Sequence, residues 1–85
     1  METGSLILAG YNSFGRPRQA FADWIALAND AEFIRITEDR IWLSAYASNN
    51  PRSDYHWQAE ACYDEAVRRG NIDLYYKAYE RAKHS

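Results

Sequence analysis

The segment of residues 31–47, AEFIRITEDRIWLSAYA, limits the choice of fold class more than any other part of the chain. Its β-branched and aromatic residues stand on both sides of the polar pair Glu38-Asp39, a pattern that favours two strands joined by a tight turn. In the simplest register, three isoleucines and one leucine share an apolar face. We therefore predict a β-hairpin over residues 32–46.

The elements around the hairpin follow from apolar patterning and from the positions of glycine and proline. The run SLILA is short, apolar and bounded by glycines, which indicates a strand. Pro17 suits the first turn of a helix, and Gly70 suits the end of one. The predicted elements are a strand over 5–9, helices over 17–29, 53–69 and 72–83, and the hairpin over 32–46. This order predicts an α+β fold, a small three-stranded sheet packed against helices in one compact domain over 1–85.

The final segment, GNIDLYYKAYERA, is similar to the second half of a tetratricopeptide repeat. Gly70, Tyr79 and Ala82 fall at that repeat's small, aromatic and small positions. The resemblance covers about half of one repeat, and nothing recurs at a period of about 34 residues. It therefore implies a helical hairpin and not a repeat protein.

Size and composition exclude several classes of protein. A chain of 85 residues with 47% hydrophobic and 26% charged residues is long enough for one globular domain. No apolar run approaches the roughly 18 residues that span a bilayer, so we expect a soluble, cytoplasmic protein without a membrane partner. The lone Cys62 excludes an internal disulfide framework, and its apolar helical surroundings predict a buried thiol.

The segment GYNSFGRPR imitates a phosphate-binding loop, with Gly10 and Gly15 separated by four residues. Such a loop needs Lys after its last glycine and then Ser or Thr, whereas this chain has Arg16 and Pro17. We therefore expect no nucleotide and no other cofactor. Arg16 and Arg18 would lie at the positive end of a helix dipole, which indicates either an acidic partner or solvated surface charges.

The outer face of the predicted hairpin is a second candidate surface. It would carry Phe33, Arg35, Arg40 and Trp42, with Arg35 directly across from Trp42 in a cation–π pair. Such a face suits a protein or a single-stranded nucleic acid. The alternative is that a helix covers it, which would place Phe33 and Trp42 in the core.

Metal binding and catalysis find little support in the sequence. His56, Glu60 and Asp64 would line up along one helix, but they fall short of a closed zinc site. His84 lies in the tail, and nothing supplies a nucleophile, a base and an oxyanion hole together. We expect neither a metal nor an enzyme.

The distribution of side-chain types favours a binding protein. The net charge of −2 argues against nucleic-acid binding by bulk electrostatics. Eight of the ten basic residues are Arg and 13 residues are aromatic, and these are the types enriched at binding hot spots. We predict a small non-enzymatic module that docks on or blocks a protein partner. In general character, though in no motif, it resembles the inhibitors that phages and mobile elements encode against host defence, anti-CRISPR proteins among them.

The surface expected to dock combines the glycine-containing loop with the hairpin face. The predicted binding residues are Tyr11, Phe14, Arg16, Arg18, Phe33, Arg35, Arg40 and Trp42. The alternative function is a small nucleic-acid-binding or accessory DNA/RNA factor that uses Arg16, Arg18, Arg35 and Arg40. The sequence leaves open whether the chain is a monomer or a homodimer.

Overall fold

A computed structural model describes residues 7–84 of the chain, and within them the secondary structure is helical. The helices are α2 (Gln19–Ala26), α3 (Asp30–Tyr46), α4 (Asp54–Arg68) and α5 (Asp73–Lys83). No β-strand occurs among these residues, and the β-type pairing between Tyr11 and Pro17 is an isolated bridge. The predicted α+β fold with a three-stranded sheet is therefore wrong, and the domain is all-helical.

The predicted hairpin over 32–46 is instead the long helix α3. Asn29 caps this helix: its side chain accepts from the Glu32 N–H at 2.8 Å, and the Glu32 carboxylate accepts from the Asn29 N–H at 3.0 Å. A cap of this kind is worth about 1 kcal/mol, whereas each β-branched residue disfavours a helix by only a few tenths. The cap and tertiary packing therefore outweigh the β propensity of the segment.

The predicted strand over 5–9 falls partly outside the described residues. Residues 7–9, the part that is described, form no strand. The helices predicted over 17–29, 53–69 and 72–83 correspond to α2, α4 and α5, with α2 starting and ending a few residues inside its range.

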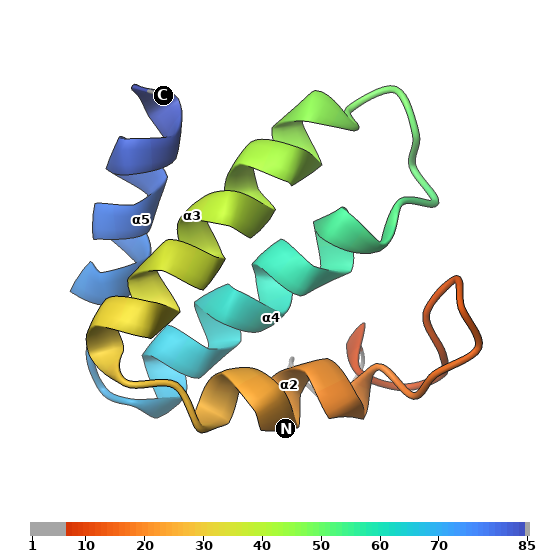
Figure 1. Ribbon diagram of the computed structural model, residues 1–85, viewed down its shortest axis with the longest axis horizontal. Helices are drawn as coiled ribbons and strands as arrows, with labels where there is room; N and C mark the ends of the chain where they lie inside the picture. The colour runs from red at the N-terminus through yellow and green to blue at the C-terminus, as the bar shows by residue number, and fades with distance from the viewer. Residues whose placement is uncertain (1–6, 85) are drawn as a thin grey trace.

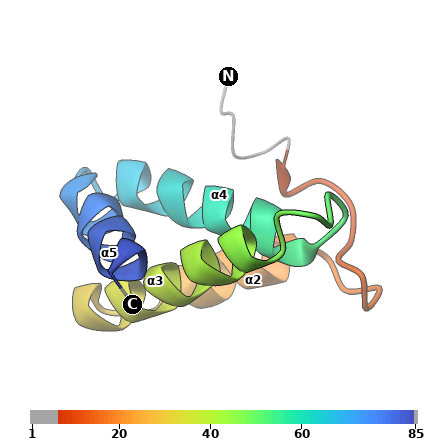
Figure 2. The same ribbon diagram turned by 90° about the horizontal axis from the view of Figure 1, so that it is seen from above.

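The helices are arranged in two layers. Figure 1 shows α3 crossing the molecule with α5 beside it and α2 running across its lower edge. In the view from above, α2 and α3 lie at one level, and α4 lies in a second layer above them (Figure 2). The short dimension of 21 Å, against 30 and 29 Å, agrees with two helix layers. Among the helices of residues 7–84, none therefore covers one face of α3.

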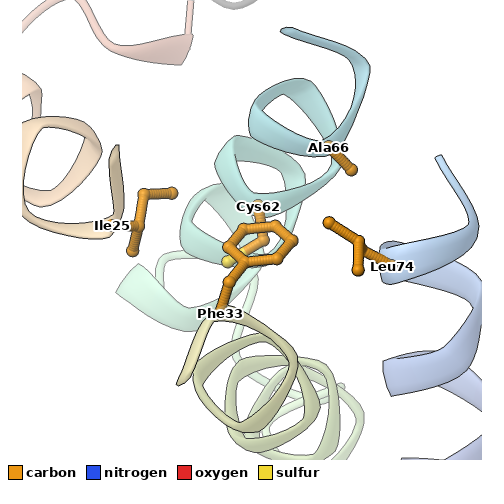
Figure 3. Close-up of a cluster of buried hydrophobic side chains, with 5 residues drawn as sticks. All are labelled: Ile25, Phe33, Cys62, Ala66 and Leu74. Atoms are coloured by element: carbon orange, nitrogen blue, oxygen red, sulfur yellow. The ribbon is translucent and has the colours of Figure 1, made fainter. Parts of the chain in front are cut away.

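The core lies where the layers meet and takes at least one side chain from each helix. Figure 3 shows Phe33 of α3 at its centre, facing Cys62 of α4, with Ile25 and Leu74 on opposite sides. Phe33, Ile25 and Cys62 are fully buried. Burial raises the pKa of the Cys62 thiol to about 11, although the Thr37 hydroxyl acts to lower it. Cys62 is therefore a packing residue.

Arg69, directly after α4, ties three helices together. Its guanidinium donates to Glu65 (2.7 Å), to Asp30 (2.9 Å) and to the carbonyls of Ile25 (2.9 Å) and Ala28 (2.8 Å). It also lies 4.6 Å from the centre of the Phe33 ring. These bonds fix the end of α2 against the start of α3.

The Glu65 carboxylate is shared between two arginines. Its side chain is 6% exposed, and it also accepts from Arg68 at 2.6 and 2.9 Å. Burial acts to raise the pKa of Glu65, but the bonds from Arg68 and Arg69 outweigh it and hold the pKa below its usual value. Glu65 is thus a negatively charged anchor in the folded protein.

The turn between α4 and α5 closes the helical pair. Gly70 adopts a φ of 71°, and the N–H of Asn71 donates to the Ala66 carbonyl while that of Gly70 donates to Val67. This is a Schellman motif, in which the left-handed residue is normally glycine.

In the part of the chain that the structure describes, no helix has both the length and the apolar character needed to cross a membrane.

Candidate protein-docking surface

The uncovered side of α3 carries a stacked pair of large aromatic rings. Trp42 and Tyr46 are separated by one helical turn, and their rings lie 5.4 Å apart and nearly parallel, at 9°. Trp42 is 44% exposed and Tyr46 is 78% exposed. The two rings together present a flat apolar surface to solvent.

Three shallow hollows lie along α3 among the described residues, and Trp42 of this pair lines two of them. The first, of about 480 Å³, lies on the α2 side and is lined by Trp24, Leu27, Ala28, Glu32, Arg35 and Ile36. The second, of about 510 Å³, is lined by Arg35, Glu38, Asp39, Trp42 and Arg81. The third, of about 150 Å³, lies on the α5 side and is lined by Ile41, Trp42, Ala45, Tyr79, Ala82 and Lys83. Arg35 joins the first hollow to the second, and Trp42 joins the second to the third.

These hollows and the rings between them form one surface, which we call the α3 face. Its large apolar members are exposed to different degrees, from Leu27 at 87% and Trp24 at 51% to Tyr79 at 44%. The α3 face consists of Trp24, Leu27, Arg35, Trp42, Tyr46 and Tyr79. Isolated exposed apolar residues are ordinary, but a contiguous patch of this kind marks an interaction site.

The acidic groups on this surface are already engaged within the chain. Glu38 accepts from Arg81 at 2.9 Å, Asp39 pairs with Arg40, and Glu32 takes part in the cap of α3. Arg35 is exposed and forms no ion pair with any of the residues described. Arg35 is therefore the charged member of the α3 face that has no ion-pair partner among the described residues.

The loop of residues 10–18 is a second exposed feature and is held in a defined shape. The Asn12 side chain accepts from the N–H groups of Phe14 and Arg16, both at 2.9 Å. Gly15 adopts a φ of 80°, a left-handed conformation that suits glycine. Phe14 on this loop is 86% exposed. The loop lies at the end of the molecule where α4 begins (Figure 1).

Asp54, at the start of α4, fastens this loop to the helices. Its carboxylate accepts from the Ser13 hydroxyl at 2.6 Å, from the Ser13 N–H at 3.1 Å and from the Trp57 indole at 3.0 Å. Burial acts to raise the pKa of Asp54, but these hydrogen bonds and the nearby charge of Arg18 outweigh it and lower the pKa. These hydrogen bonds thus hold the loop against the start of α4.

The structure separates the predicted binding residues into two sets. Five lie exposed at the surface, namely Tyr11, Phe14 and Arg16 in the loop and Arg35 and Trp42 on α3. The other three, Arg18, Phe33 and Arg40, are partly or fully buried and packed against the fold.

Arg18, Phe33 and Arg40 are held by internal contacts. The Arg18 guanidinium lies 5.0 Å from the centre of the Trp57 ring and donates to backbone carbonyls at 3.0 and 3.3 Å. Arg40 lies 5.5 Å from the Phe21 ring centre, beside Asp39. Phe33 fills the core. These residues position helices and offer little surface to a partner.

Trp24, Leu27, Tyr46 and Tyr79 belong to the α3 face but were not predicted from the sequence. The signal that would have found Tyr46 is its spacing of four residues from Trp42, which is meaningful only on a helix. On a helix over 17–29, apolar spacing would place the first two on the inner face, whereas α2 ends at Ala26 and leaves Leu27 exposed.

His56 connects the start of α4 to the end of α3. The Ser44 hydroxyl donates to its Nδ1 at 2.7 Å, and its Nε2–H donates to the carbonyls of Asn50 (2.9 Å) and Ala47 (3.2 Å). Residues 7–84 contain no group of three or more His, Cys, Asp or Glu side chains placed to hold a metal ion. Both ring nitrogens of His56 are used in the hydrogen bonds that link α3 to α4.

Comparison with known proteins gives no family for this fold. No protein-family model, no curated protein and no solved structure matches the chain.

Proposed function

We propose that this chain is a non-enzymatic protein-binding module whose partner docks on the α3 face. The observation that carries the proposal is the stacked Trp42–Tyr46 pair, exposed on the uncovered side of α3 and bordered by hollows. Trp, Tyr and Arg are the residues that dominate binding energy at interfaces, because they offer large rigid area and forked hydrogen bonds. All three are present on this face.

The Ser44–His56 pair supports a binding role over a catalytic one. A nucleophilic serine needs nearby free N–H donors to stabilise an oxyanion. Ser44 lies within α3, where the neighbouring N–H groups are already bonded along the helix. His56 uses its second nitrogen to hold the loop after α3. The pair therefore acts as a structural link in this proposal.

The arginines argue for a protein partner over a nucleic acid. Of the four that the nucleic-acid alternative requires, Arg18 and Arg40 are occupied by contacts within the fold. Arg16 and Arg35 remain exposed, on the 10–18 loop and on α3 respectively. A nucleic-acid site needs a continuous positive track that follows the phosphates. In this proposal the chain therefore docks on a protein and thereby blocks it.

The proposal is tested with two matched double variants. Leu27→Ala/Tyr46→Ala removes two exposed side chains from the α3 face, and Val67→Ala/Tyr55→Ala removes a comparable pair from α4. All four side chains are at least 37% exposed, so each double variant should retain the wild-type melting temperature to within a few degrees. Each protein is immobilised and compared with wild type for capture of proteins from a lysate of the cell that encodes it.

The expected result is that the α3-face variant loses a captured protein that the wild type and the α4 variant both retain. Truncation of a hot-spot residue typically weakens binding by about 2 kcal/mol or more, which is about thirtyfold. Equal capture by the two double variants would show that the α3 face is not the docking surface.

A further inference from the structure

We infer that the α3 face recognises an acidic amphipathic helix of the partner, whose carboxylate meets Arg35 while apolar side chains enter the hollows on either side. This inference rests on the proposed function and names the chemistry of its partner. The observation behind it is the position of the Arg35 guanidinium, which has no ion pair among the described residues, relative to the first and third hollows.

The charge complementarity begins with the acidic groups that already have a partner in the fold. Glu38 and Asp39 are each paired with an arginine, and Glu32 is used in the cap of α3. Arg35 alone among the charged residues lining the first two hollows has no ion pair or hydrogen bond to any of the residues described. A carboxylate placed over Arg35 would complete a forked pair, whereas a lysine there would meet only like charge.

The apolar part of the partner is set by the first hollow, which Arg35 itself lines, and by the third hollow, which Trp42 lines. The first hollow lies between α2 and α3, and the third lies between α3 and α5. Ile36 of the first and Ala45 of the third are separated by about 14 Å along the helix axis. A partner helix that crosses α3 and reaches both hollows covers at least this distance, in about nine residues or more, so its apolar anchors stand at least two to three turns apart.

The same geometry disfavours a nucleic acid at this face. One free guanidinium between apolar hollows matches a single carboxylate, whereas a phosphate backbone requires several cations in a row. Arg81 and Lys83, at the edge of the face, each have an acidic partner. The observations therefore favour a peptide helix with its acidic residue between two apolar anchors.

The experiment uses a library of 16-residue peptides displayed on phage and selected on the immobilised full-length protein. The selected peptides are then measured in solution against wild type, Arg35→Glu, the double variant Leu27→Ala/Tyr46→Ala and the control Arg52→Glu, an exposed arginine in the loop before α4. We expect Asp or Glu to be enriched between apolar anchors. Arg35→Glu should weaken binding about tenfold or more, and a peptide with Lys in place of the acid should regain affinity for that variant.

The other outcomes overturn the inference in distinguishable ways. Peptides that depend on Leu27 and Tyr46 but not on Arg35 would refute the acidic partner and leave the proposed function standing. Peptides whose affinity does not change when Leu27, Tyr46 or Arg35 is replaced would overturn both the inference and the proposed docking face. A selection that enriches no peptide would overturn the inference. Binding of a 20-nucleotide single strand that Arg35→Glu abolishes would assign the face to nucleic acid. A dimer seen by light scattering and lost in Arg35→Glu would assign it to a second copy of the chain.

Discussion

Replacement of Arg69 by Ala is expected to unfold much of this small protein under mild denaturing conditions. The Arg69 side chain is 13% exposed and donates to the carboxylates of Glu65 and Asp30 and to the backbone carbonyls that end α2. In the variant, the Glu65 carboxylate, which is 6% exposed, loses Arg69 and keeps its bonds to Arg68. It also leaves the carbonyls of Ile25 and Ala28 without their donor.

The size of the effect follows from the burial of these groups. Glu65 keeps its bonds to Arg68, so the cost comes mainly from the two backbone carbonyls that lose a charged donor, at about 1.5–3 kcal/mol each, or about 3–6 kcal/mol together. A chain of 85 residues is expected to have a stability of about 4–13 kcal/mol, at roughly 0.05–0.15 kcal/mol per residue. Arg69→Ala therefore removes about a quarter of the stability or more. Arg69→Lys keeps the charge but not the fork, and we expect it to lose about 2 kcal/mol.

The measurement is urea unfolding followed by circular dichroism, with Arg68→Ala as the matched control. Arg68 binds the same Glu65 carboxylate but is 63% exposed, so its removal should cost at most about 1 kcal/mol. The reasoning fails if Arg69→Ala and Arg68→Ala lower the urea midpoint by the same small amount. The end of α2 carries Trp24 and Leu27, so the stability of this contact also sets the shape of the first hollow.

Further predictions concern the buried and shared polar groups. The pKa of Glu65 is lowered by folding, so its contribution is complete above about pH 4.3 and disappears as the pH falls through the lower folded-state value. The urea midpoint of Glu65→Gln should therefore fall less steeply in acid than that of wild type, and parallel curves would contradict this. Cys62, with its pKa raised to about 11, should react with an aromatic disulfide reagent at pH 8 only on unfolding, and rapid native labelling would refute its burial. Asp54→Asn should cost about 1–2 kcal/mol and speed amide exchange over residues 10–18, and unchanged exchange would show that Ser13 does not fasten the loop.

The helices α4 and α5 could be predicted because their boundaries are local. Ser53 accepts from the Tyr55 N–H at the start of α4, and Gly70 takes the left-handed conformation that ends it. Both residues carry these preferences by themselves, independently of the rest of the fold. The apolar spacing between them also fits a helix and no strand pattern.

The α3 segment could not be assigned from its own composition. Its isoleucines fit an alternating strand pattern and a helical one, and β-branched residues favour the strand. The deciding signal, Asn29 followed by Glu32, lies at the edge of the segment and is the sequence form of a capping box. The cap at Asn29, together with tertiary packing, therefore outweighs the strand preference of the interior residues.

This one difference also determines which aromatic side chains are exposed. Phe33 and Trp42 share a face on a hairpin with its turn at Glu38-Asp39. On a helix that turns about 100° per residue, nine residues place them on opposite sides. Phe33 accordingly enters the core, while Trp42 faces solvent together with Arg35. The sequence therefore lists Arg35 and Trp42 as candidate binding residues without separating them from the core residue Phe33, and it does not reveal Tyr46.

The three tryptophan indole N–H signals in a proton–nitrogen NMR spectrum test the docking claim most directly. Trp24 and Trp42 belong to the α3 face, whereas Trp57 is 7% exposed and bonded to Asp54, so it serves as an internal reference. When a partner protein or a selected peptide binds, we predict that the Trp24 and Trp42 signals shift while the Trp57 signal stays in place. A ligand that binds and leaves the Trp24 and Trp42 signals unchanged would contradict docking on the α3 face.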